Sequence, residues 1–176
     1  MKVTTTAHCR SVTVSTCDLN EWLNENSLDA PAVNKQRLPA IMPHGLFRGR
    51  RAADLMAFTG LVQVDVDARH NEHVPRDLWP TICRTFAEQV AAVEVAQVSA
   101  SGAGFYALVH APACSSFPAM AAHVLTIARN ELGRIARSHD VGPVAIDEKC
   151  AYNLAALRFP GVGPVVHGRA AQLHGG

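Results

Sequence analysis

The chain has 176 residues, which is enough for one domain with a hydrophobic core. Hydrophobic residues make up 48% of it and charged residues 18%, and this balance excludes a disordered chain. The chain has 16 basic and 15 acidic side chains, so its net charge does not predict a nucleic-acid partner. Nucleic-acid binding would require a local cluster of basic residues.

The five cysteines are scattered and form no C-x-x-C pair, which argues against a zinc cage or a disulfide framework and favours reduced thiols. The N-terminus lacks the apolar stretch of a secretory signal. No window approaches the roughly 20 apolar residues of a membrane span. These features predict a soluble, cytoplasmic protein without a membrane partner.

The first third of the chain predicts short elements joined by loops. Residues 11–16 alternate β-branched and small polar residues and predict a strand, after which Asp18 can cap a short helix. Three prolines follow and indicate a loop, with a short strand at residues 40–42. Residues 48–58 begin with three arginines and predict a helix that Gly60 ends.

The remaining two thirds mix strands and helices. Apolar residues recur at helical spacing in two segments, which predicts two helices, and Ser116 can cap the second. Short apolar runs between and after these segments predict strands. We expect a strand at 61–66, a helix at about 77–93, strands at 95–100 and 105–110, a helix from Ser116 to about 135, and closing strands at 144–146 and 154–159. This order predicts a single α+β domain over residues 1–176 rather than a doubly wound parallel sheet.

Two carboxylates end the strand at residues 61–66. Asp65 and Asp67 stand at i and i+2, so in an extended strand they point to the same face. Paired carboxylates repel each other unless a cation lies between them, and hard oxygen ligands suit Mg²⁺ or Mn²⁺. Two solvated aspartates at a strand end are the alternative, although Arg69 and the basic residues before the strand favour a metal site.

A second candidate is the segment Ser99-Ala-Ser101-Gly102-Ala-Gly104 between two expected strands. Small residues and glycines let backbone N–H groups approach an anion such as a triphosphate. The same composition is also that of an ordinary glycine-rich hairpin turn.

Asp147 ends another short apolar run and could complete a site of three carboxylates, for which Asp140 is a weaker competitor. Arg158 lies within an apolar segment and needs a carboxylate or a phosphate as partner. No Gly-x-Ser-x-Gly elbow and no Walker-type loop occurs in the chain.

Five segments stand in a characteristic order: Leu38-Pro-Ala-Ile-Met-Pro-His-Gly45 with Phe47, Thr59-Gly60 leading to Val64-Asp-Val-Asp67, Ser99-x-Ser101-Gly102-x-Gly104, Ile146-Asp147-x-Lys149-Cys150, and Leu157-Arg158-Phe159. Between about residue 38 and residue 160 the chain resembles the archaeo-eukaryotic primase superfamily. It is most similar there to the domain at the N-terminus of virulence-associated E-like mobile-element replication proteins.

The resemblance implies an RRM-like primase-polymerase catalytic core beside a small N-terminal α/β unit. It implies a nucleotidyltransferase that joins NTPs or dNTPs on a single-stranded DNA template during replication of a phage, plasmid or other mobile element. Two Mg²⁺ or Mn²⁺ ions would be held by Asp65, Asp67 and Asp147. The triphosphate would be bound by Ser99, Ser101, Gly102, Gly104, Lys149 and Arg158. A helicase domain or protein would be a partner outside this chain.

Many members of the superfamily have a Ser-x-His motif whose histidine contacts the incoming nucleotide. Here Phe105 and Tyr106 follow the loop, and His110 lies at the far end of that strand. Either other groups bind the triphosphate, or polymerisation is weak or lost. Arg48, Arg50 and Arg51 are candidate nucleic-acid contacts, and a solvated helix face is their alternative.

Two other functions remain open from the sequence. A non-catalytic module of the same fold would bind single-stranded nucleic acid in a salt-dependent way. A nucleotide-sugar glycosyltransferase would use the D-x-D pair to hold Mn²⁺ against a diphosphate, but the chain is short for two lobes and Asp147 would have no function.

Overall fold

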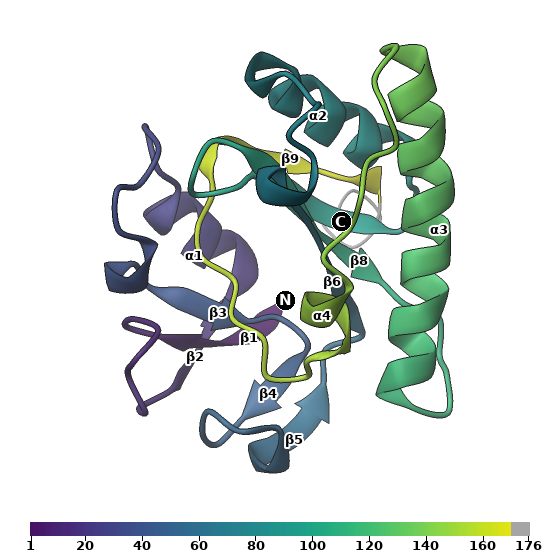
Figure 1. Ribbon diagram of the computed structural model, residues 1–176. Helices are drawn as coiled ribbons and strands as arrows, with labels where there is room; N and C mark the ends of the chain where they lie inside the picture. Colours follow the sequence, from purple (N-terminus) through teal and green to yellow (C-terminus); the bar gives the residue numbers. More distant parts are fainter. Residues whose placement is uncertain (170–176) are drawn as a thin grey trace.

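The computed structural model describes residues 1–169 and shows an α+β protein, which confirms the expected fold class (Figure 1). Its strands are β1 (Lys2–Thr6), β2 (Ser15–Asp18), β3 (Ala40–Met42), β4 (Gly45–Phe47), β5 (Leu55–Phe58), β6 (Leu61–Asp67), β7 (Val93–Val98), β8 (Gly104–His110) and β9 (Val162–His167). Its α-helices are α1 (Leu19–Asn26), α2 (Trp79–Gln89), α3 (Phe117–Ser138) and α4 (Glu148–Tyr152).

The largest sheet is antiparallel and has the strand order β6-β8-β7-β9. The elements from β6 onward follow the order β6-α2-β7-β8-α3-α4-β9. This order includes the split β-α-β arrangement of RRM-like units, in which β8 lies between β6 and β7. The last strand, β9, joins β7 and leaves β6 at the opposite edge. That edge lies beside α4 and the segment before it, where the Asp147 backbone N–H donates to the Asp65 carbonyl at 2.8 Å.

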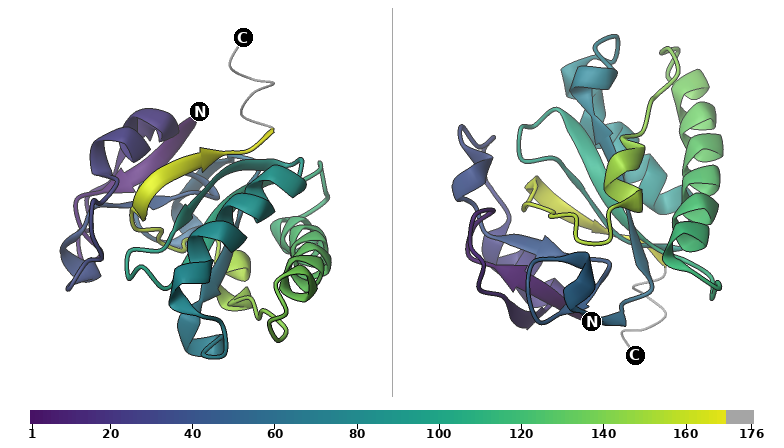
Figure 2. Two further views of the ribbon diagram at one scale, coloured as in Figure 1. Left: turned by 90° about the horizontal axis from the view of Figure 1, so that it is seen from above. Right: turned by 60° about the horizontal axis from the view of Figure 1, so that its bottom comes forward.

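The two faces of this sheet are covered by different layers (Figures 1 and 2). Along β6, Val62, Val64 and Val66 point to one side, where α2 and α3 complete the larger core. The alternate positions point to the other side, where Leu61 of β6 and Leu108 of β8 pack against the N-terminal residues. Because side chains alternate along a strand, Asp65 and Asp67 lie on the face toward the N-terminal unit.

The N-terminal unit consists of the sheet β2-β1-β3 with α1 beside it. The Asp18 carboxylate accepts hydrogen bonds from the N–H groups of Asn20 and Glu21, which confirms the predicted helix cap. The strand expected at residues 11–16 begins later, at Ser15, and β1 was missed. The strand expected at residues 40–42 is confirmed as β3.

The prediction of a helix at residues 48–58 is wrong. The chain turns back here through a short 3₁₀ helix, Ala52–Asp54, and continues as β5, which pairs with β4. The Asp54 carboxylate accepts from both the backbone and the side chain of Arg51 and so stabilises the turn. The segment has no helical apolar face, since Met56 and Phe58 are about half exposed.

The prediction of two closing strands, at residues 144–146 and 154–159, is also wrong. Residues 144–147 are extended, but their partner is the Asn71 side chain, which accepts from the Ala145 N–H at 2.6 Å and donates to the Ala145 carbonyl at 3.0 Å. Near Arg158 there is a single bridge, to Ile41 of β3. The true closing strand is β9, which contains Gly163 and Pro164 and therefore lacks a strand-like sequence.

Among residues 1–169, no helix is both long and apolar enough to cross a membrane.

Candidate active site

Asp65 is the centre of the candidate site, and its carboxylate has two partners. Arg158 donates from Nη1 to Oδ1 at 2.6 Å, and the Cys150 thiol donates to Oδ2 at 3.4 Å. The guanidinium of Arg158 also lies 4.8 Å from the centre of the Tyr106 ring, in a cation–π contact. Burial is the largest single effect and would lower the pKa of Arg158, but the Asp65 carboxylate, together with Tyr106 and Cys150, raises it and the net shift is upward. The buried arginine is therefore charged and holds the carboxylate in place.

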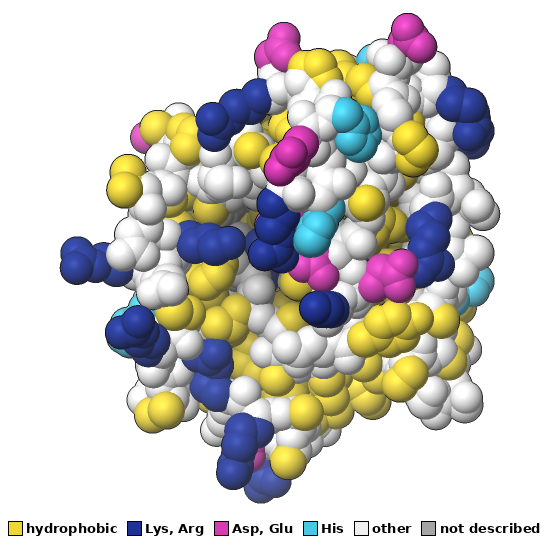
Figure 3. All heavy atoms as spheres, in the orientation of Figure 1, with side chains coloured by type: hydrophobic (Ala, Val, Ile, Leu, Met, Phe, Trp, Pro, Cys, Tyr) yellow, Lys and Arg dark blue, Asp and Glu magenta, His cyan; other side chains and the backbone are white. Residues whose placement is uncertain are grey.

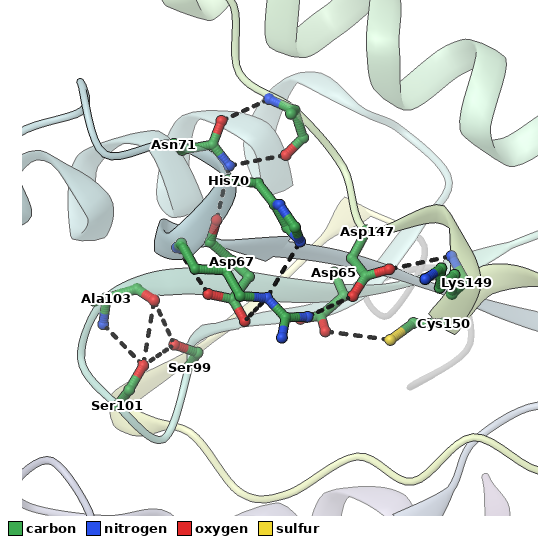
Figure 4. Close-up of polar contacts among 12 residues, drawn as sticks. Asp65, Asp67, His70, Asn71, Ser99, Ser101, Ala103, Asp147, Lys149 and Cys150 are labelled. Atoms are coloured by element: carbon green, nitrogen blue, oxygen red, sulfur yellow. Dashed lines mark hydrogen bonds and ion pairs between the residues drawn. The ribbon is translucent and has the colours of Figure 1, made fainter.

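Asp147 is brought to Asp65 by the segment along the edge of β6. It precedes α4, and its carboxylate accepts from the Lys149 N–H at 3.2 Å. Figure 4 shows the side chains of Asp65, Asp147 and Cys150 pointing toward one another, and one donor atom from each lies within 4.8 Å of the others. Two carboxylates that are distant in sequence thus meet beside a thiol.

Asp67 lies on the same face of β6 but outside this group of three. Its carboxylate accepts from the Arg69 N–H at 3.0 Å and caps the short 3₁₀ helix Ala68–His70. The Arg69 guanidinium bridges two carboxylates, with Nε 3.3 Å from Asp67 and Nη2 3.0 Å from Asp147. Sequence analysis identified Arg69 only as a flanking charge, and the structure places it between the predicted acidic residues.

Cys150, to which the sequence assigned no function, is the third member of the group. Burial and the adjacent Asp65 carboxylate raise the pKa of its thiol to about 12. At neutral pH the thiol is therefore protonated and serves as a hydrogen-bond donor to Asp65. The two carboxylates, without the protonated thiol, could hold a divalent cation.

The loop at residues 99–104 joins β7 to β8 and lies next to Asp67, because Gly104 is the register partner of Asp67. The hydroxyls of Ser99 and Ser101 lie 3.0 Å apart, and both donate to the Ala103 carbonyl. Gly104 has φ +100°, and a Cβ there would overlap the Val66 carbonyl oxygen, so its glycine is needed for close strand approach. Ser99 and Ser101 line the site, although both hydroxyls donate within the loop.

Five of the predicted residues line one small cavity of about 30 Å³, enough for a water molecule: Asp65, Asp67, Ser99, Ser101 and Arg158. Lys35, which the sequence did not single out, also lines it. Asp147 and Lys149 line an adjacent open groove of about 580 Å³, together with Arg69 and His70. Arg69 is paired with Asp67, which lines the cavity, and with Asp147, which lines the groove.

The three arginines at residues 48–51 lie apart from this site and have other contacts. Arg50 donates from Nη1 to the carbonyls of Cys9 at 2.8 Å and Ser11 at 2.9 Å. Arg51 is paired with Asp54 at 3.2 Å, and Arg48 is exposed. Their predicted contact with nucleic acid stays a prediction.

His44 is a buried residue that supports the site from the side of the N-terminal unit. Its Nδ1–H donates to the Asn153 carbonyl at 3.1 Å, and its Nε2 accepts from the Gln63 N–H at 3.0 Å. Burial lowers the pKa of His44 to about 4, so the ring is neutral at pH 7. Through these two hydrogen bonds His44 connects β6 to the end of α4. The sequence contains no signal for this role beyond a histidine between Pro43 and Gly45.

A family model described as BT4734-like, N-terminal domain, matches residues 33–131, which is more than half of the chain. The chain belongs to this family. The matched part of the BT4734-like domain contains Asp65, Asp67 and the loop at residues 99–104, and it ends within α3. Asp147, Lys149 and Arg158 lie beyond the match. No curated protein and no solved structure matches the chain.

Proposed function

We propose that this BT4734-like domain is a nucleotidyltransferase of the primase-polymerase type, which joins nucleotides on a single-stranded DNA template with Mg²⁺ or Mn²⁺. The observation that carries the proposal is the meeting of Asp65 with Asp147 beside the open groove, next to the loop at residues 99–104. The ordered sequence motifs that resemble archaeo-eukaryotic primases support the same assignment.

The donor set fits a divalent cation. Asp65 and Asp147 present carboxylate oxygens within 4.8 Å of each other, and such oxygens are the preferred ligands of Mg²⁺ and Mn²⁺. Asp67 is the third carboxylate of the proposal, and Arg69 now neutralises it. When bound, a divalent cation would neutralise phosphate charge and favour ionisation of the attacking hydroxyl.

The remaining residues would bind and position the substrate. The groove of about 580 Å³ can accommodate a nucleoside triphosphate, with Lys149 and the exposed Arg69 available to its phosphates. Arg158 acts through Asp65, since its Nη1 already donates to that carboxylate, and it is therefore a positioning residue. Fixed charges in a preorganised site supply most of the rate acceleration that phosphoryl transfer requires from a protein.

The test is primer extension and de novo synthesis with labelled nucleotides, in Mg²⁺ and in Mn²⁺. The variant Asp65→Asn/Asp67→Asn removes two charges from the site with little change in shape. Asp77→Asn/Asp140→Asn removes two charges from exposed positions and is the matched control. We expect metal-dependent product from the wild type and the control and none from the site variant. Equal product from all three proteins would contradict the proposal.

A second candidate function is a non-catalytic module that binds single-stranded nucleic acid. One observation favours it: Arg158 is paired with Asp65, and Arg69 is paired with both Asp67 and Asp147, so every predicted metal ligand already has a cationic partner. This candidate predicts binding without incorporation by the folded wild type, in either metal.

A further inference from the structure

A second groove, on the N-terminal unit, has a basic lining. It has a volume of about 370 Å³ and is lined by His8, Arg10, Asn34, Gln36 and Arg37. These residues offer cations and amides, and the lining contains no carboxylate. In Figure 3, Lys and Arg side chains spread over the part of this face formed by the N-terminal unit, whereas most acidic side chains lie elsewhere, near the centre of the face and along its upper edge.

The two walls of the groove are joined to each other by polar contacts. One wall is the loop after β1, and the other is the short 3₁₀ helix Lys35–Arg37, which Asn34 caps by accepting from the Gln36 N–H at 3.1 Å. Cys9 donates from Sγ to the Gln36 carbonyl at 3.4 Å, and Arg10 donates to Gln36 Oε1 at 3.5 Å. The groove is thus a formed feature of the fold.

Arg50 holds the first wall in place. Its Nη1 donates to the carbonyls of Cys9 and Ser11, on either side of Arg10. These bonds fix the loop backbone from which the Arg10 side chain extends. Arg50 is therefore a positioning residue for the groove.

One short helix contributes residues both to this groove and to the small cavity of the candidate active site. Lys35, the first residue of the 3₁₀ helix Lys35–Arg37, lines the small cavity with Asp65 and Asp67, and Arg37, the last, lines the basic groove. The short helix therefore presents one cation to the acidic residues, Lys35, and one to the basic groove, Arg37.

We propose that this groove binds the phosphodiester backbone of single-stranded nucleic acid, which reaches the active site past Lys35. Arg10 and Arg37 would contact phosphates, and the amides of Asn34 and Gln36 would bond to phosphate or sugar oxygens. Because no Phe, Tyr or Trp lines the groove, binding is to the backbone and independent of base sequence. The role of this nucleic acid as a template rests on the proposed function, whereas its binding to the groove does not.

The test is fluorescence anisotropy of a labelled oligothymidylate over a range of salt concentrations, without nucleotides or metal. Arg10→Gln/Arg37→Gln removes both cations of the groove. Arg84→Gln/Arg137→Gln makes the same charge change at exposed positions of α2 and α3, on the other side of the large sheet, and is the matched control. Thermal melting establishes that both variants are folded.

We expect the groove variant to bind about 10-fold more weakly at low salt, with the slope of log K against log salt reduced by about 1.4, or 0.7 for each lost phosphate contact. The control should bind like the wild type. The proposal would be overturned if both variants lost the same affinity or if the groove variant lost none. It would also be overturned if the wild type bound a duplex more tightly than the oligothymidylate, or did not bind the oligothymidylate at all. If binding depends on the groove but the wild type incorporates no nucleotide, this proposal stands and the proposed function is contradicted. If the wild type incorporates nucleotides but the groove variant binds the oligothymidylate as tightly as the wild type, the proposed function stands and this proposal is contradicted.

Discussion

Arg158 and Asp65 form a pair whose burial decides its energetic importance. Their side chains are 9% and 15% exposed and lie 2.6 Å apart, whereas Arg129 and Glu148 lie at the same distance with side chains 47% and 48% exposed. We predict that Arg158→Gln lowers the free energy of unfolding by about 3 kcal/mol, because Asp65 loses its buried counter-charge. Arg129→Gln should cost less than about 1 kcal/mol. Urea denaturation measures both, and equal losses would show that burial does not matter here.

His44 makes stability depend on pH. Its pKa is about 4 in the folded protein and about 6.5 in the unfolded chain, so between these values the unfolded chain binds the extra proton. The free energy of unfolding should therefore fall by about 3 kcal/mol from this residue as pH decreases from 6.5 to 4. Denaturation of wild type and His44→Gln at pH 7 and pH 4.5 measures the difference. An equally steep pH dependence in both proteins would contradict the prediction.

Arg69 competes with a metal for the same carboxylates. Its guanidinium contacts Asp67 and Asp147, although its side chain is 64% exposed and free to move into solvent. We predict that Arg69→Ala binds Mn²⁺ about 5-fold more tightly, since a competing cation is removed. Isothermal titration calorimetry provides the comparison, with Arg84→Ala on the exposed side of α2 as control. Weaker binding by Arg69→Ala would mean that Arg69 supports the metal site.

Among the elements, those with a local signal could be predicted from sequence. The caps at Asp18 and Ser116 lie where α1 and α3 begin, and the alternation along β6 places Asp65 and Asp67 on one face. By contrast, the residues at 144–147 form no strand: the distant Asn71 side chain occupies both backbone groups of Ala145, and a single backbone bond, from the Asp147 N–H to the Asp65 carbonyl, joins the segment to β6. The partners of Asp147 and Arg158 likewise depend on contacts between segments far apart in the chain.

Asn71 is the single residue on which the position of the segment at 144–147 depends most. It is fully buried, and its amide bonds to the Asp67 carbonyl and to both backbone groups of Ala145. We predict that Asn71→Ala lowers the free energy of unfolding by about 2–4 kcal/mol, since it leaves buried backbone groups without partners. Amide hydrogen exchange should rise at residues 145–147. The control is Asn130→Ala, on the exposed side of α3, and similar exchange in both variants would contradict this role of Asn71.

The whole molecule places its candidate functional surfaces on one face of the large sheet and along the β6 edge, where Asp147 and the open groove lie. Helices α2 and α3 cover one face, and the N-terminal unit covers the other, where the carboxylates, the serine hydroxyls and the basic groove are found (Figures 1 and 2). The family match covers Asp65 and Asp67 but ends before Asp147, which the fold brings next to Asp65.

The most direct test of this account is therefore the effect of Asp147→Asn on templated nucleotide incorporation. Asp140→Asn is the matched control, since Asp140 is exposed and has φ +52°, a conformation that asparagine also adopts. The account predicts that Asp147→Asn lowers the rate by about 100-fold or more while the protein stays folded, and that Asp140→Asn retains wild-type activity. Incorporation by Asp147→Asn at the wild-type rate would contradict the assignment of Asp65 and Asp147 to a common active site.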